Sequence, residues 1–181
     1  RRGAHAGSLQ KNKAHAAKIS ARTGQREEGS ALKENSCAFS GHRLLGDDFD
    51  RQLLERVTEG LMKRGVLTFY CGMAKGFDLA AAETVLKFRD RYGAKLVACI
   101  PYEGQPERFS SSDRERYLNI LEYCDEKVVF SKNYNRCCMH ARDRYMAENC
   151  GVLVCYLRKK SGGTFYTVNY ARTLGVKIIE V

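Results

Sequence analysis

Three short segments of the chain combine glycine with residue types that bind anions. They read SGHR at 40–43, CGMAKGFD at 71–78 and SGGT at 161–164. Glycine lets the backbone approach a ligand closely, and the free N–H groups at the start of a helix point toward negative charge. Basic side chains in or beside these segments, such as Arg43 and Lys75, would strengthen such a site. Together these residue types would suit the binding of an anion.

Each segment also has a simpler explanation as chain geometry. A glycine after a strand is common in turns. Asp78 and Thr164 could serve only as helix caps, because their side-chain oxygens accept hydrogen bonds from free N–H groups. His42 could be a structural turn residue, and Arg142 could be a solvated charge on an amphipathic helix. The argument for a site therefore depends on whether the fold brings these segments together.

The pattern of apolar residues predicts alternating strands and helices after residue 35. Expected strands are 36–39, 66–70, 96–100, 127–130, 152–156 and 176–180; expected helices are 48–63, 77–92, 112–123, 138–148 and 164–173. The strands are nearly continuous apolar runs, which is typical of a parallel sheet covered by helices on both faces. We therefore expect an α/β fold: a Rossmann-like three-layer α/β/α arrangement with an open, mainly parallel sheet of about six strands.

In such a sheet, ligands bind beyond the carboxyl ends of the strands. The loops that follow the expected strands include the three glycine segments, the segment 101–106 with Tyr102, and the segment 131–134. All of them should lie along one edge of the sheet. We expect Met73, Phe77 or Tyr102 to flank a base or a ribose there.

Composition limits the class of protein and the partners. The chain has 181 residues and a formal net charge of +10. Residues 1–34 hold eight Lys/Arg and three Glu, hence +5, with few large aliphatic residues; they predict a disordered basic tail, followed by one domain over 35–181. The longest apolar runs are far shorter than a membrane span, so no membrane partner is expected. Eight cysteines without a disulfide pattern predict a reducing, cytoplasmic location.

Familiar catalytic and metal-binding motifs are missing from the sequence. It contains no GxxxxGK[ST] phosphate loop, no GxGxxG dinucleotide fingerprint and no GxSxG nucleophile elbow. Cys137, Cys138, His140 and Cys150 do not have the spacing of a standard zinc site. We therefore expect no metal and no resident cofactor.

Residues 37–181 resemble the SLOG superfamily, which includes the YpsA-like proteins, the LOG cytokinin-activating enzymes and DprA. The matching stretches are SGHR (40–43), CGMAKGFDLAAAETVL (71–86), IPYEGQPERFS (100–110), CMHARDRYM (138–146) and SGGTFYTVNYA (161–171), and they are most similar to the bacterial YpsA-like branch. The resemblance implies a Rossmann-like fold that binds a nucleotide or a nucleotide-derived ligand. The contacts it implies are Gly41, Arg43, Gly72, Met73, Gly76, Asp78, Arg142, Gly162, Gly163, Thr164 and Thr167; the loop sequences add His42, Phe77 and Tyr102.

One departure from the LOG pattern bears on function. The catalytic glutamate that LOG enzymes carry after their glycine motif is replaced by Thr167, and a hydroxyl is a poor general acid or base near neutral pH. The resemblance therefore favours a non-enzymatic sensor or regulatory domain for an ADP-ribose-like ligand. Two alternatives stay open: an N-glycosidic hydrolase using Asp78, Glu83 or Glu103, and DprA-like binding of single-stranded DNA, which the body of the chain does not favour. The relatives also suggest a homodimer.

Overall fold

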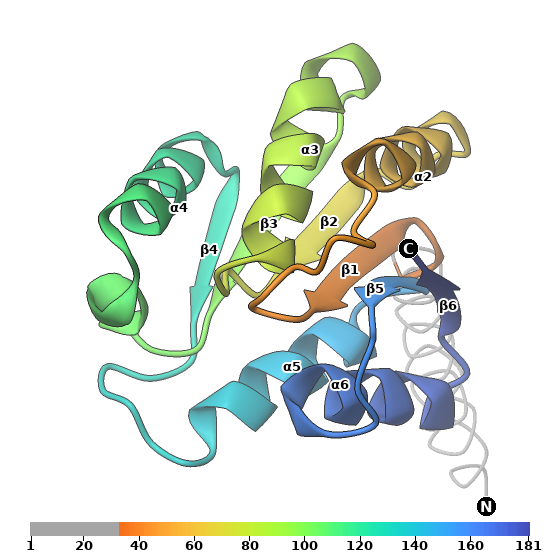
Figure 1. Ribbon diagram of the computed structural model, residues 1–181. Helices are drawn as coiled ribbons and strands as arrows, with labels where there is room; N and C mark the ends of the chain where they lie inside the picture. Colours follow the sequence, from red (N-terminus) through yellow and green to blue (C-terminus); the bar gives the residue numbers. More distant parts are fainter. Residues whose placement is uncertain (1–32) are drawn as a thin grey trace, which may run out of the picture. The chain divides into compact units, whose positions relative to one another are not determined.

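The computed structural model describes residues 33–181, and the predicted basic tail lies almost wholly outside that range (Figure 1). The strands are β1 Ser36–Gly41, β2 Thr68–Cys71, β3 Lys95–Ile100, β4 Glu126–Val129, β5 Val152–Tyr156 and β6 Lys177–Glu180. The helices are α2 Arg51–Lys63, α3 Phe77–Tyr92, α4 Ser111–Tyr123, α5 Cys138–Glu148 and α6 Gly162–Thr173, with a short 3₁₀ helix, η1, at Gln105–Arg108.

The strands form one parallel sheet with the order β4-β3-β2-β1-β5-β6. The chain moves outward from β1 to β4 and then returns to the other side of β1. The order therefore reverses between β1 and β5, where Gly41 lies beside Tyr156 in register. In open α/β sheets this reversal point, at the carboxyl ends of the strands, is the usual place for a ligand.

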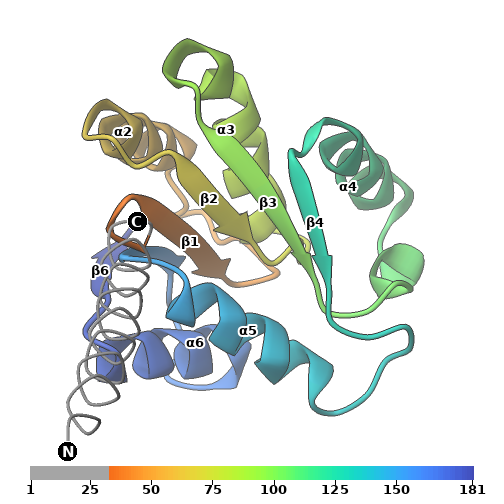
Figure 2. The ribbon, with the colours of Figure 1, turned by 180° about the vertical axis from the view of Figure 1, so that it is seen from behind.

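Helices cover both faces of the sheet, as the sequence predicts. Helices α2, α3 and α4 lie on one face, and α5 and α6 on the other (Figures 1 and 2). Alternate residues of β1 pack against the two faces of the sheet. Phe39 belongs to the core cluster that includes Leu54 and Val85, whereas Ala38 belongs to the cluster that includes Met146 and Val168. Burial on both faces explains why the strands are continuous apolar runs. The prediction of a three-layer, Rossmann-like α/β fold is confirmed.

The helix starts divide into capped and uncapped ones. The Asp50 side chain accepts a hydrogen bond from Leu53 N at 2.9 Å, so α2 begins at Arg51 and not at residue 48, as the sequence suggested. Ser110 caps α4 in the same way. By contrast, α3 and α6 follow Gly76 and Ser161, and neither makes a side-chain cap hydrogen bond. Helix α5 also lacks a hydrogen bond to its N-cap side chain, Cys137, but α3 and α6 are the ones that begin at glycine segments.

Within the described residues, no helix is long and apolar enough to cross a bilayer. Most of the eight cysteines are buried. Buried thiols behave as small apolar side chains, which is the role that the sequence suggests for Cys71, Cys99 and Cys155.

Gly76 shows how tightly the first two glycine segments pack together. Its backbone has φ +79° and ψ −118°, and an added Cβ would lie 2.5 Å from the Arg43 carbonyl oxygen and 2.8 Å from that of His42. Phe77 N also donates to the His42 carbonyl at 3.2 Å. A residue with a side chain would thus be strained in its backbone and would push the two loops apart.

We expect Gly76→Ala to lower the free energy of unfolding by about 3 kcal/mol, because it combines strained backbone with overpacking. Gly60→Ala is the matched control: Gly60 lies inside α2 with open space around an added Cβ. That change should raise stability by about 0.5–1 kcal/mol. Urea denaturation of both variants measures the difference, and equal effects of the two would contradict the packing described.

Candidate functional site

A cavity of about 580 Å³ opens at the carboxyl ends of β1 and β5; we call it cavity 1. Its wall comes from the loop after β1, the β2–α3 loop, one face of α5, the end of β5 and the first turns of α6. The predicted residues on this wall are Gly41, His42, Arg43, Asp78, Arg142, Gly163, Thr164 and Thr167. The fold therefore brings all three glycine segments to one cavity, as the sequence analysis expected.

The remaining predicted residues lie elsewhere. Met73 and Phe77 are fully buried and line neither this cavity nor its neighbour. The Phe77 ring packs against Phe39 and Tyr156, at centroid distances of 6.4 and 6.1 Å. Their position suits packing beneath the site rather than contact with a base. Gly72 and Gly76 lie in the β2–α3 loop but do not line cavity 1, and Gly162 is the first residue of α6. Tyr102 lines the neighbouring cavity.

The floor of cavity 1 is a buried cluster of two carboxylates and one guanidinium. Arg142 Nε lies 2.7 Å from Asp143 Oδ1, and Arg142 Nη1 lies 3.9 Å from Asp78 Oδ2. Arg142 is only 7% exposed and Asp78 only 5% exposed. Arg142 also donates to the Gly72 carbonyl. The alternative explanation of Arg142 as a solvated surface charge is therefore wrong.

Asp78 has one buried carboxyl oxygen whose hydrogen bonding is incomplete. Its Oδ2 accepts from Ala74 N at 3.2 Å, whereas Oδ1 is buried and has no hydrogen-bond partner of normal geometry within residues 33–181. Burial raises the pKa of Asp78 to about 6, and the Arg142 charge and the Ala74 amide offset only part of this rise. A ligand hydroxyl or amino group could donate to Oδ1, because Asp78 lines cavity 1.

His42 joins two loops at the mouth of cavity 1. Its Nε2 accepts hydrogen bonds from Arg158 N at 2.9 Å and from Lys159 N at 3.2 Å. Burial lowers the pKa of His42, and the nearby charges of Lys159 and Arg158 lower it further. The neutral imidazole is therefore the form that holds the β5–α6 loop in place.

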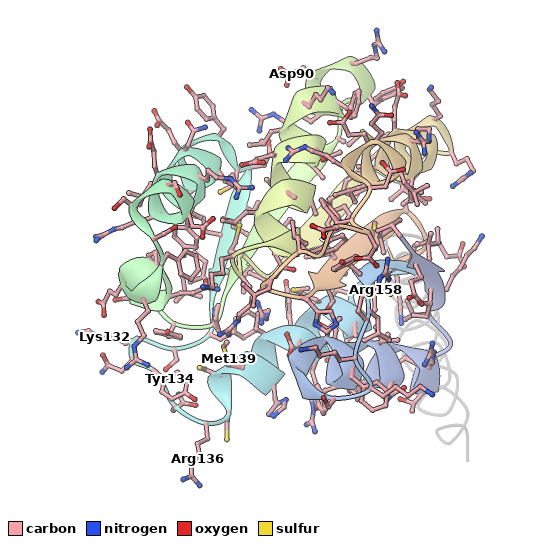
Figure 3. The ribbon with its side chains drawn as sticks, in the orientation of Figure 1. Asp90, Lys132, Tyr134, Arg136, Met139 and Arg158 are labelled. Carbon is pink, nitrogen blue, oxygen red and sulfur yellow. The ribbon has the colours of Figure 1, made fainter. Side chains whose placement is uncertain are left out.

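Arg158 and Tyr156 form a second connection, which the sequence analysis missed. The Tyr156 hydroxyl donates to Asp48 Oδ1 at 2.6 Å and accepts from Gly46 N at 3.1 Å. The Arg158 guanidinium stacks 4.3 Å over the Tyr156 ring, pairs with Asp48 and lies 3.2 Å from Glu180 Oε1 (Figure 3). In the sequence, Arg158 is marked only by its position two residues after the end of β5, at the edge of the sheet where ligands bind. These contacts hold the loop after β1 over the cavity.

The first turn of α6 lies open to the cavity. Ser161 occupies the N-cap position without a side-chain hydrogen bond, and Gly162 has φ +84°. Thr164 is therefore not the N-cap; it lies in the first turn, on the cavity wall. The Thr167 hydroxyl donates to the Gly163 carbonyl at 2.9 Å. This turn can present backbone N–H groups to an anion.

A neighbouring hollow of about 910 Å³, cavity 2, shares Arg43, Ala74, Met139 and Gly163 with cavity 1. Its other walls are the β3–α4 segment, with Tyr102 and η1, and the long β4–α5 loop. Lys132 and Tyr134 lie in that loop, and Met139 lies at the start of α5 (Figure 3). The two cavities thus adjoin along a wall that includes the α6 turn.

Comparison with known proteins identifies the family of this chain. Residues 48–176 match the model of the YspA SLOG family. The chain belongs to this family. It is also similar to the UPF0398 protein BH1768 of Halalkalibacterium halodurans, with 23% identity over 144 residues that cover 77% of this chain and 76% of that protein.

Two solved structures of DNA processing protein A share the fold of this SLOG chain. The protein from Streptococcus pneumoniae is 23% identical with a TM-score of 0.61, over 82% of this chain and 50% of its own. The protein from Helicobacter pylori is 15% identical with a TM-score of 0.62, over 84% of this chain and 67% of its own. The SLOG chain thus spans only half the length of the Streptococcus protein.

We expect His42 to make the stability of this SLOG domain depend on pH. Its pKa is lowered in the folded state, so its contribution is present above its unfolded pKa of about 6.5. That contribution is lost as the pH falls through the folded pKa, because the protonated Nε2 can no longer accept hydrogen bonds.

Urea denaturation at pH 7.5 and pH 5.5 measures this effect, with His42→Gln as the comparison. Glutamine keeps a hydrogen-bond acceptor but does not titrate. The native chain should lose more stability than the variant between the two values. The raised pKa of Asp78 acts in the opposite direction, but it is present in both proteins and cancels in their difference. Equal losses would show that His42 does not hold the loop.

Proposed function

We propose that this chain binds a small nucleotide-derived ligand of the ADP-ribose type and acts as a sensor or regulatory domain. One observation carries the proposal: cavity 1 joins a glycine-rich helix start without a side-chain cap to a buried carboxyl oxygen, Asp78 Oδ1, that makes no hydrogen bond of normal geometry to the described residues. A nucleotide has the matching pair of groups, since its phosphate is an anion and its ribose hydroxyls are hydrogen-bond donors. The volume of about 580 Å³ is within the range of small-ligand pockets.

The phosphate would lie against residues 162–164. Backbone N–H groups at a helix start and the helix dipole both favour an anion there. Arg43 and Lys159, which also line cavity 1, place positive charge near the same wall. An added Cβ on Gly163 would have no heavy atom within 4 Å, so a ligand has room to approach the backbone.

The ribose end would lie toward the floor. Asp78 Oδ1 needs a donor, and a ribose hydroxyl can supply one. Arg142 stabilises the ionised form of Asp78, so that form is available near neutral pH. The acidic floor and the basic mouth would together fix the orientation of the ligand.

We expect Gly163→Asp to weaken binding of AMP and ADP-ribose by at least about tenfold, because it places a negative charge beside the phosphate. Gly163→Asn has nearly the same size without the charge and should retain most of the affinity. Titration calorimetry and ligand-induced shifts in melting temperature on the full chain measure both.

Gly60→Asp, on α2 and outside cavity 1, is the control for an added charge. It should leave the affinity unchanged. If neither nucleotide shifts the melting temperature of the native chain, the proposed function is wrong. Equal affinities of the Gly163→Asp and Gly163→Asn variants would place the phosphate elsewhere.

A specific observation keeps N-glycosidic hydrolysis as an alternative. Among the acids suggested by the sequence, Asp78 lines cavity 1 and has a pKa raised to about 6, a suitable value for a general acid or base. Glu83 pairs instead with Arg51 and Arg116, and Glu103 lies in cavity 2. Asp78 is therefore the acid to test.

If the chain is a hydrolase, incubation with AMP releases free adenine and ribose 5-phosphate, and Asp78→Asn abolishes this release. The amide keeps the shape of the side chain but cannot exchange a proton near neutral pH. Chromatography of the products provides the measurement. Intact AMP after prolonged incubation with the native chain would exclude this alternative for that substrate.

Binding of single-stranded DNA is a second alternative. The structure of the Helicobacter pylori relative concerns a mode of single-stranded DNA binding. In this chain, cavity 2 combines Tyr102 and Tyr134 with Lys75 and Lys132, and such pairs of aromatic and basic residues suit stacked bases and phosphates. The acidic Glu103 and Glu107 on the same wall oppose a long polyanion.

A further inference from the structure

Cavity 2 contains a buried hydrogen-bond acceptor that no described residue satisfies. Gln105 is 4% exposed and lines this cavity. Its Nε2 donates to the Gly72 carbonyl at 3.2 Å, which fixes the orientation of the amide. Its Oε1 is therefore turned away from Gly72, and it has no hydrogen-bond partner within residues 33–181. Buried acceptors of this kind usually have a partner.

Two aromatic residues, Tyr102 and Tyr134, line cavity 2 together with Gln105. Tyr102 and Tyr134 form an edge-to-face pair with a centroid distance of 5.4 Å. Tyr102 precedes Gln105 by one turn, and its carbonyl accepts from Gln105 N at 3.1 Å. A planar ring with an amino group can pack on a tyrosine and donate to Oε1 at the same time. Nucleobases and their carboxamide analogues have these two properties.

Cavities 1 and 2 also share a structural feature. Each has one buried acceptor without a partner among the described residues, Asp78 Oδ1 in the first and Gln105 Oε1 in the second. The wall that they share includes Arg43 and Gly163, the residues beside which the phosphate of the proposed ligand would lie. Lys75 adds a further positive charge on the cavity 2 side. A ligand with phosphate in its middle and a nucleoside at each end would fill both cavities.

We infer that cavity 2 is a second base-binding subsite and that the ligand is a dinucleotide, two nucleosides joined through phosphate. This inference rests on the proposed function, because cavity 1 holds the first nucleotide. The base in cavity 2 packs on Tyr102 and donates an amino hydrogen to Gln105 Oε1. The phosphates lie between the ends, against the α6 turn. ADP-ribose ends in a ribose without a base, whereas the proposed ligand carries a base at that end.

The test compares ligands that differ only by the second nucleoside or base. ADP-ribose and NAD are one such pair, linked by pyrophosphate; AMP and the 3′–5′ dinucleotide ApA, which adds one adenosine to the phosphate of AMP, are the other. Calorimetry on the full chain should show the dinucleotide of at least one pair binding about tenfold more tightly than its partner, from one hydrogen bond and one stacked ring. If NAD binds more tightly than ADP-ribose and the other pair shows no such difference, the ligand is a free dinucleotide. If ApA binds more tightly than AMP and affinity increases further with a longer oligo-dA strand, the ligand is nucleic acid.

Two variants locate this gain in cavity 2. Gln105→Met removes the acceptor at similar volume, and Tyr102→Ala removes the ring. Each should reduce the affinity ratio within the pair by about threefold, because each removes one of the two contacts that produce the gain. Tyr123→Ala is the control: Tyr123 is an exposed tyrosine at the end of α4, outside both cavities, and its removal should leave the ratio unchanged.

The failures of the two proposals are distinguishable. If AMP or ADP-ribose binds but neither dinucleotide binds more tightly, the dinucleotide inference is wrong and the proposed function stands. If the gain persists in both Gln105→Met and Tyr102→Ala, the second base lies elsewhere and the inference is again wrong. If no probe binds, both proposals are wrong.

Discussion

The backbone carbonyl of Gly72, just after β2, binds one residue from each of the two cavities. It accepts hydrogen bonds from Arg142 of α5 and from Gln105 of η1. These donors come from opposite sides of the sheet edge, and glycine is required between them because an added Cβ would overlap the Arg142 guanidinium. Two hydrogen bonds from charged and amide donors fit the two lone pairs of one carbonyl. The positions of Asp78, Asp143 and the Gln105 acceptor all follow from this contact.

The charge cluster around Arg142 is difficult to explain by stability alone. Removing a guanidinium and two carboxylates from water is costly, and apolar residues of similar volume often stabilise a fold as well or better. Asp78 shows the cost directly: burial raises its pKa to about 6 although the Arg142 charge and the Ala74 and Gly41 amides lower it, and its Oδ1 makes no hydrogen bond of normal geometry within residues 33–181. Groups that are incompletely satisfied in the free protein become favourable when a ligand completes their hydrogen bonds. The cluster is thus better explained by binding than by folding.

The sequence alone predicted the fold and the cavity edge, because both follow from hydrophobic pattern. Continuous apolar strands imply a parallel sheet, and a parallel sheet places all the following loops on one edge. The direction of individual side chains does not follow from that pattern. Phe77 was therefore expected beside a base although it packs in the core, and Arg142 could not be distinguished from a surface residue. Gln105 was missed because a neutral amide in a loop gives no signal until its Oε1 is seen without a partner among the described residues.

The structure also shows that the glycines of the three segments are required for different reasons. An added Cβ would overlap the Phe77 ring at Gly41 and the Arg142 side chain at Gly72, so packing alone requires glycine at both positions. Gly163 differs, because an added Cβ would meet nothing within 4 Å and its φ is not positive. A glycine in the middle of a helix costs about 0.5–1 kcal/mol relative to alanine, and a glycine in the first turn still loses more backbone entropy on folding than alanine would. Neither packing nor backbone strain accounts for that cost at Gly163, whereas close approach of a phosphate to the α6 turn would.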